Sequence, residues 1–363
     1  MLPQKTDIRL LSLDFLRGLI MVLLMISSTG VYDYLYEKTT SGPLHLFFEQ
    51  FVHHPWNGLR FWDLVQPLFM FMAGAAMAYS LEKQRLSGVP WSRTFTKILK
   101  RCGWLFFWGV LDYAVRPGGL SFELWDVLTQ LSFTTLLAFL IFRWSNIAQI
   151  AVCVGLLLLT EILYRYTNIT GFDQPFTNMH NFGNYMDLVL MNKINSDGWV
   201  AINCLPTAVH TIAGAMAGKL LMQGGRKISP MIIWGIGCII LGYGLDIAGI
   251  TPIIKRIATS SFTIVSLGYC LLFLALCYWW IDVRNHRKRL AFFTIVGMNA
   301  IFIYVFFEIV GARWFNEYIS AIASGLIPNL PEVVKVIFSA CCIFALEWGL
   351  CYFLYKKKIF FKV

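Results

Sequence analysis

Charged side chains are scarce in this sequence: Asp, Glu, Lys and Arg together make up only 14% of its 363 residues. A soluble domain typically carries about 25% of these residues. Apolar residues make up 58%, more than a water-soluble fold of this length can hide from solvent. The scarcity of charge therefore excludes an ordinary soluble domain and predicts a protein that uses the lipid bilayer as one of its solvents.

The sequence also lacks the motifs of several enzyme classes. It contains no HExxH, GxSxG or Walker A motif, and no GxGxxG framed by a strand and a helix. Metalloprotease, serine hydrolase and nucleotidase activities are therefore without support. Its nine cysteines form no CxxC pair and nearly all lie inside apolar runs. We expect buried thiols, with no metal site and no disulfide framework.

Ten apolar runs account for most of the chain, each near the 20 residues that a helix needs to cross the hydrocarbon core. They cover residues 12–31, 61–81, 95–114, 124–142, 146–165, 200–222, 229–248, 259–281, 290–311 and 333–355. The pattern predicts an all-α, polytopic membrane helix bundle of about ten transmembrane helices. No linker interrupts it, so we expect one domain over residues 1–363. The start lacks a cleavable signal pattern, so the first span is expected to be permanent.

Lys and Arg concentrate on one side of the predicted membrane, above all in residues 83–101, 284–289 and 356–362. Such a bias marks the cytoplasmic side, which predicts that both termini lie inside. The net charge of +10 therefore reflects topology and not nucleic acid binding. The clusters at 83–101 and 284–289 either contact anionic lipid or recognise the phosphates of coenzyme A. Arg93, Lys97, Arg101 and Arg287 are the candidates for the second role.

Several ionisable residues lie inside predicted spans, where such side chains usually face the bundle interior or a wet cavity. Asp14 and Arg17 share a helix face and would form a structural ion pair or help to bind an anionic cofactor. Tyr304 and Glu308 also share a face, and Glu308 either binds substrate or is a structural carboxylate. His210 lies among small residues, which favours a hydrogen bond between packed helices.

The segment His53-His54-Pro55-Trp56-Asn57-Gly58 lies just outside the second predicted span and is followed by Asp63. A histidine here can act as a general base, because its unperturbed pKa lies near neutral pH. Asp63 would orient the imidazole, while Trp56 offers a stacking face and Asn57 an amide. An interfacial surface feature is the alternative. The long outside loop 166–199 is polar and turn-rich, and is either a lid or wall for a sugar-like ligand or a solvated loop.

Four blocks of the sequence resemble the heparan-α-glucosaminide N-acetyltransferase family and its bacterial relatives. They are Arg9-Leu-Leu-Ser12-Leu-Asp14-Phe-Leu-Arg17-Gly18; Trp56-Asn57-Gly58 with Asp63, Pro67 and Gly74; Lys255 with Thr259-Ser260-Ser261-Phe262; and Gly297-Met298-Asn299 with Tyr304 and Glu308. The end of the chain, from Tyr355 to Lys362, also resembles the end of that family. The blocks follow one another in order and cover essentially the whole chain.

The resemblance implies a transmembrane acyltransferase. The family takes an acetyl group from cytoplasmic acetyl-CoA and transfers it to the amine of a terminal glucosamine on the far side. Its essential histidine precedes the Trp-Asn-Gly block by three residues, which is His53 here. The expected acceptor site comprises Ser28, Trp56, Asn57, Asn299, Tyr304 and Glu308, and the expected coenzyme site Asp14, Arg17, Arg93, Lys97, Arg101 and Arg287.

The sequence departs from the family at several positions. Ser28 stands where members often carry an asparagine, and Thr129 and Gln130 replace a Gln-Arg pair. Ala258 replaces a tryptophan. These departures keep two alternatives open, namely a sugar or amino-sugar transporter and a non-catalytic family member. We expect the protein to lie in a bacterial inner membrane, in contact with lipid, and to use no metal. The acetyl group could pass directly from coenzyme A to the acceptor or through an acetyl-histidine relay. The protein could also form a homodimer.

Overall fold

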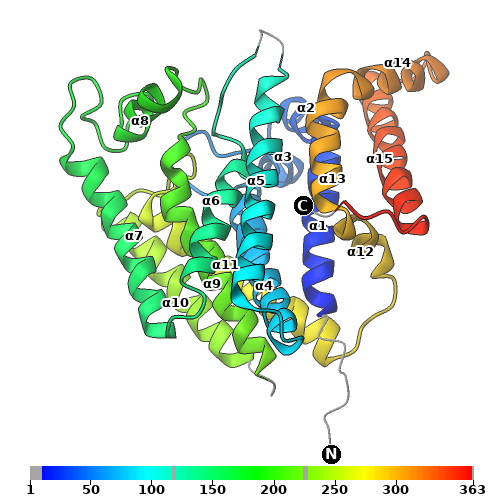
Figure 1. Cartoon of the computed structure of the whole chain (residues 1–363). Coiled ribbons are helices and arrows are strands. Elements are labelled where there is room, and N and C mark those ends of the chain that lie inside the picture. The colour runs from blue at the N-terminus through cyan, green and yellow to red at the C-terminus, as the bar shows by residue number, and fades with distance from the viewer. Residues whose placement is uncertain (1–9, 117–119, 224–227, 362–363) are drawn as a thin grey trace, which may run out of the picture.

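The computed structural model describes residues 10–116, 120–223 and 228–361 (Figure 1). Arg9 and Lys362, which begin and end the family blocks, lie outside these residues. The described chain is all-α, as predicted, and its only extended pairing is an isolated antiparallel bridge between Asn57 and Ile254.

The helices follow one another with short connections. They are α1 Leu11–Ser28, α2 Val31–Lys38, α3 Pro43–Glu49, the 3₁₀ turn η1 Phe61–Leu64, α4 Val65–Leu86, α5 Trp91–Ala114, α6 Val127–Leu140, α7 Asn146–Tyr166, α8 Phe182–Met191 and the 3₁₀ turn η2 Ala201–Asn203. The second half comprises α9 Cys204–Met222, α10 Ile228–Ile247, α11 Ser260–Cys277, the π-helical turn η3 Tyr278–Val283, α12 Ala291–Met298, α13 Ala300–Val305, the π-helix η4 Phe306–Phe315, α14 Asn316–Leu326 and α15 Glu332–Lys356.

Within the described ranges, six helices are long and apolar enough to cross a membrane: α1, α4 with η1, α7, α10, α11 with η3, and α15. A seventh span results if α12 and the helix that follows it, bent by 76° at Asn299, count as one. The prediction of about ten spans is thus confirmed for six or seven. The runs at 95–114, 124–142 and 200–222 also form helices, but α6 has only 14 residues and α5 begins with several basic side chains.

Peripheral helices expose long rows of large apolar side chains. α7 lies at one edge of the molecule and α15 at the other (Figure 1). The rows include Ile147, Ile150, Val154, Leu158, Leu159 and Ile162 on α7, and Ile232, Ile233, Trp234, Ile236, Ile240, Leu241 and Ile247 on α10. A soluble monomer rarely exposes apolar patches of this extent. The chain is therefore an integral membrane protein whose outer helices face lipid.

The interior is held by close helix crossings at small residues. A Cβ atom at Gly214 of α9 would lie 2.0 Å from the carbonyl oxygen of Phe71 on α4, and one at Gly18 of α1 would lie 1.9 Å from that of Phe293 on α12. Such contacts between backbones drive helix association where the hydrophobic effect is weak. As predicted, His210 bonds across helices, with Nε2 2.9 Å from Ser266 Oγ on α11.

We expect Gly214→Ala to destabilise the protein, because the added methyl group meets the backbone of α4 and forces the two helices apart. Overpacking of this kind typically costs about 1–3 kcal/mol. The measurement is the midpoint of thermal aggregation in detergent. Gly237→Ala is the matched control: its Cβ meets nothing within 4 Å, so the midpoint should stay or rise. Equal midpoints for the two variants would contradict the crossing.

Candidate active site

His53 is brought to its position by a contact between two segments that are far apart in sequence. The antiparallel bridge joins Asn57 to Ile254, and the Gly58 N–H donates to the Ile253 carbonyl at 2.8 Å. Gly58 has a φ of 148°, and a Cβ there would lie 2.5 Å from the His54 ring. This pairing carries Lys255 to His53, with 3.0 Å between Lys255 Nζ and His53 Nδ1.

Asp63 is buried and fixes the imidazole of His53. Its Oδ2 accepts the backbone N–H groups of Arg60 at 2.9 Å and of His54 at 3.3 Å. Its Oδ1 lies 3.0 Å from His53 Nδ1. Because an ionised carboxylate only accepts hydrogen bonds, Nδ1 carries the proton and Nε2 is the basic nitrogen. The structure thus brings together the two residues that the sequence singled out for catalysis.

Burial and, after it, the nearby Lys255 ammonium together lower the pKa of His53 to about 4, although the hydrogen bond and charge of Asp63 act in the opposite direction. The imidazole is therefore neutral at pH 7. Its side chain is 38% exposed, and it lines two cavities. Burial also lowers the pKa of Lys255 to about 8. Since Nδ1 already donates to Asp63, Lys255 acts on the ring as a neighbouring charge.

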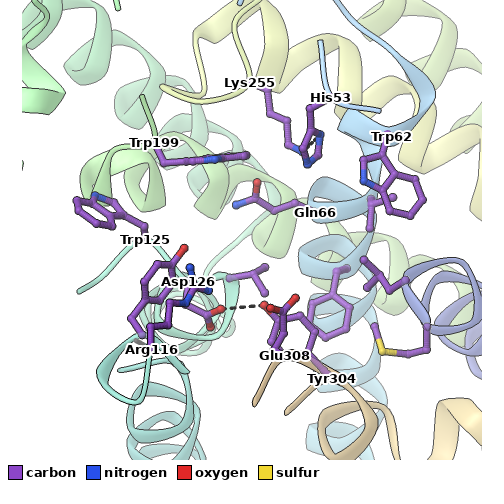
Figure 2. A pocket seen from close by; sticks show the side chains of 16 residues that line it. His53, Trp62, Gln66, Arg116, Trp125, Asp126, Trp199, Lys255, Tyr304 and Glu308 are labelled. Atoms are coloured by element: carbon purple, nitrogen blue, oxygen red, sulfur yellow. Dashed lines mark hydrogen bonds between the residues drawn. The ribbon is translucent and has the colours of Figure 1, made fainter. Parts of the chain in front are cut away.

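The imidazole points into a cavity of about 260 Å³, which we call the outer cavity (Figure 2). It is lined by His53, Lys255, Trp62, Gln66, Tyr113, Arg116, Trp125, Asp126, Trp199, Tyr304 and Glu308, with the apolar Met21, Leu24, Val65, Phe69 and Val127. Three indoles form much of its wall. The carboxyl groups of Asp126 and Glu308 lie together across the cavity from His53 and Lys255 (Figure 2).

The acidic side of the outer cavity is built by the start of α6 and by η4. Asp126 caps α6, with Oδ1 accepting the Leu128 N–H at 2.7 Å. Its Oδ2 accepts the Tyr304 hydroxyl at 2.8 Å. Tyr304 and Glu308 share a helix face, as predicted, and both line the cavity. This arrangement offers two carboxyl groups to a cationic or hydroxylated ligand that reaches His53.

The loop of residues 166–199 contributes a wall to this cavity. Asp187 is buried, accepts the Ala201 N–H at 2.9 Å and holds the indole of Trp125 at 3.0 Å. Burial raises the pKa of Asp187 to about 7. Trp199 at the end of the loop forms the wall itself, with Lys255 Nζ 5.1 Å from its ring centroid. The second part of this loop therefore packs against the cavity, whereas its first part includes exposed residues such as Asp173 and Gln174.

Four expected acceptor-site residues do not line the outer cavity, namely Trp56, Asn57, Asn299 and Ser28. The Trp56 indole donates to the Phe176 carbonyl at 2.7 Å and so anchors the outside loop. Asn57 is exposed beside its bridge to Ile254. Asn299 is buried at the bend after α12, where its amide binds the C-terminal segment at Ile359 and Phe361. The side chains of Trp56 and Asn299 thus make structural contacts, whereas Asn57 takes part through its backbone.

Ser28 lies in a second cavity, of about 300 Å³, which also reaches His53 and Glu308. Its hydroxyl donates to the Met25 carbonyl at 2.8 Å within α1. Gln130, at the other departure from the family, accepts a hydrogen bond from Gln66 of the outer cavity.

The expected coenzyme residues divide into two groups. Arg17 and Arg101 line a third cavity of about 230 Å³, the inner cavity, which lies toward the N-terminal end of α1. Asp14 Oδ1 is 3.9 Å from Arg17, and Arg101 Nε is buried without a hydrogen-bond partner among the described residues. Arg93, Lys97 and Arg287 are exposed and line none of these cavities.

Sequence reasoning missed several lining residues. They include Lys255, Asp126 and Trp199. Lys255 lies in one of the blocks that resemble the family, and Trp199 ends the polar loop 166–199, so both positions carried a signal. No group of three or more His, Cys, Asp or Glu side chains in residues 10–116, 120–223 and 228–361 could hold a metal ion.

Comparison with known proteins agrees with the resemblance seen in the sequence. A family model described as "Domain of unknown function (DUF5009)" matches residues 9–218. Human heparan-alpha-glucosaminide N-acetyltransferase is 24% identical over 429 aligned positions, which cover 98% of this chain. The chain spans 60% of the length of that human protein. It is a distant homologue of it.

Proposed function

This chain belongs to the DUF5009 family, and on that premise we propose that it is a membrane-bound acyltransferase. In this proposal it moves an acetyl group from cytoplasmic acetyl-CoA to the amine of an amino sugar or glycan. Both termini are cytoplasmic, about ten helices cross a bacterial inner membrane, and His53 works at the periplasmic side. The observation that carries the proposal is the Asp63–His53–Lys255 constellation, which opens on a cavity with two carboxyl groups opposite.

The constellation suits acyl transfer from a thioester to an amine. A neutral His53 can remove a proton from the acceptor nitrogen through Nε2 as that nitrogen attacks the thioester carbonyl. The Lys255 ammonium can stabilise the negative charge that develops on the carbonyl oxygen. The carbon–sulfur bond then breaks, coenzyme A leaves as the thiol, and an amide remains. A relay through an acetyl group on His53 Nε2 uses the same atoms in two steps.

The two sides of the outer cavity support an amino-sugar acceptor. The carboxyl groups of Asp126 and Glu308 would hold an ammonium group near His53. The indoles of Trp62, Trp125 and Trp199 offer flat faces to a sugar ring. For the donor, Arg17 and Arg101 bring two guanidinium groups to one inner cavity, and planar guanidinium groups suit bidentate contacts with phosphates.

The test is coenzyme A release by the purified protein in detergent, with acetyl-CoA and a panel of amino sugars and oligosaccharides. Acceptor-dependent release is the expected result. It would exclude the non-catalytic alternative that the departures at Ser28 and Gln130 suggest. The transporter alternative predicts saturable uptake into sealed vesicles without acetyl-CoA; uptake together with no release across the whole panel would replace the proposal.

Lys255→Met should change the pH profile at both ends. The lost ammonium no longer opposes protonation of the imidazole, so the pKa of His53 rises from about 4 toward its ordinary 6.5. Activity requires neutral His53, so the acid limb should move up by about one pH unit. At the alkaline end, Lys255 of the wild type loses its charge above about pH 8, so the activity of the wild type should decline there.

Lys255→Arg is the matched control for this prediction, because it keeps the charge. Its acid limb should stay near that of the wild type, and the decline above pH 8 should disappear. The measurement is kcat/KM from pH 4 to 9. The acceptor titrates identically in all three proteins, so ratios of the profiles report on the enzyme. An unchanged acid limb in Lys255→Met would show that the ammonium does not act on His53.

A further inference from the structure

We propose that the outer and inner cavities are two halves of one passage through the bundle, and that the side chain of Phe69 on α4 is the barrier that separates them. Of the described residues, Phe69 is the one that lines both cavities. Its side chain is only partly buried although it belongs to a membrane helix, as expected for a residue that lines two cavities. The inference rests on the proposed function only for the identity of the molecule that enters the passage.

Four elements each contribute residues to both cavities, at helical spacing. Above Phe69 they give Met21 and Leu24 of α1, Val65 and Gln66 of α4, Val127 of α6, and Tyr304 and Glu308 of α13 and η4. Below it they give Arg17 and Ile20 of α1, Met72, Ala73 and Ala76 of α4, Leu131 of α6, and Ala300 and Ile301 of α13. Residues three or four apart share a helix face. The two cavities are therefore stacked along one axis between the same helices.

The size and chemistry of the path fit a slender, flexible chain with an anionic end. From Gln66 to Ala76 the rise along α4 is about 15 Å. The inner end presents Arg17 and Arg101, the middle is apolar, and the outer end presents Lys255 beside His53. An acyl-thioester on a pantetheine arm has this order of groups, with its phosphates at one end and its thioester at the other.

Small side chains leave room for the Phe69 ring to move. Ala73, Ala76, Gly297 and Ala300 all line the inner cavity directly beyond the ring. In this proposal a change of the χ1 rotamer of Phe69 moves its ring toward that space. With the ring in place the two sides of the membrane stay sealed from each other, and with the ring displaced a narrow chain can pass.

The experiment reads accessibility and not activity. Leu24→Cys places a thiol in the outer cavity, above Phe69. None of the nine native cysteines lines the outer or the inner cavity, so labelling of the parent protein gives the background. A membrane-impermeant maleimide is applied to one side of the membrane at a time, using right-side-out and inside-out vesicles. With Phe69 present, the thiol should be labelled from the outer side only.

In Phe69→Ala the inner-side labelling rate should rise at least tenfold, with the outer-side rate unchanged as a check of the fold. Phe69→Trp should be labelled from the outer side only. Phe71→Ala is the matched control, because it removes the same ring from the same helix outside both cavities. Inner-side labelling that does not rise in Phe69→Ala, or that rises as much in Phe71→Ala, would overturn the proposal. Absent turnover in the wild type would refute the transferase and leave this result standing.

Discussion

Acceptor-dependent release of coenzyme A should fall by about 10²–10⁴-fold in His53→Ala, the range that a positioned general base contributes. The imidazole is the only basic ring nitrogen in the outer cavity among the described residues. Alanine removes it and leaves the buried Asp63 beside Lys255, 3.7 Å apart, so the carboxylate keeps a cationic partner and the fold should survive. The measurement is kcat/KM at pH 7, alongside the thermal midpoint of the purified protein.

His54→Ala is the matched control. The backbone N–H of residue 54 still donates to Asp63, and the lost ring packs under Gly58 away from the outer cavity. We expect its activity to stay within a fewfold of the wild type. A His53→Ala variant that keeps a tenth or more of the activity would assign the base to another group. An equal loss in His54→Ala would show that the loop as a whole, and not His53, sets the rate.

Local sequence patterns predicted what depends on local chemistry. Apolar runs located the membrane helices, because length and hydropathy decide whether a helix can cross lipid. His53 and Asp63 are ten positions apart and sit on either side of one helix start, so their pairing could be anticipated. The small residues around His210 predicted a hydrogen bond between packed helices, since small residues allow helix backbones to approach closely.

Contacts between distant segments could not be predicted in this way. Lys255 reaches His53 only because residues 57–58 pair with 253–254, and no periodicity signals a two-residue bridge across 200 positions. The expected continuous span at 290–311 is broken at Asn299, whose amide binds the C-terminal segment. Trp56 was expected at the acceptor site, but its indole donates to the carbonyl of Phe176, a residue far away in the sequence.

Asp63→Asn should lower kcat/KM by about 10²–10⁴-fold while the protein stays folded. An asparagine oxygen in place of Oδ2 still accepts the N–H groups of Arg60 and His54. The amide nitrogen then replaces Oδ1 and donates to His53 Nδ1. The imidazole proton moves to Nε2, and the basic lone pair no longer faces the outer cavity. The substitution therefore changes the tautomer of the base while the hydrogen bonds to the backbone stay in place.

Asp246→Asn tests whether any such exchange at the outer end of the bundle has this effect. Asp246 Oδ1 accepts the Ile253 N–H at 2.9 Å, and asparagine preserves that bond, so activity should change by less than about twofold. In Asp63→Asn the Lys255 ammonium also loses a neighbouring negative charge, which lowers the pKa of Lys255 below about 8 and moves the alkaline decline to lower pH. A purely structural Asp63 would reduce the amount of folded protein and leave this limb in place. The position of the alkaline limb in the pH profile of Asp63→Asn thus shows whether Asp63 positions the catalytic groups or only stabilises the fold.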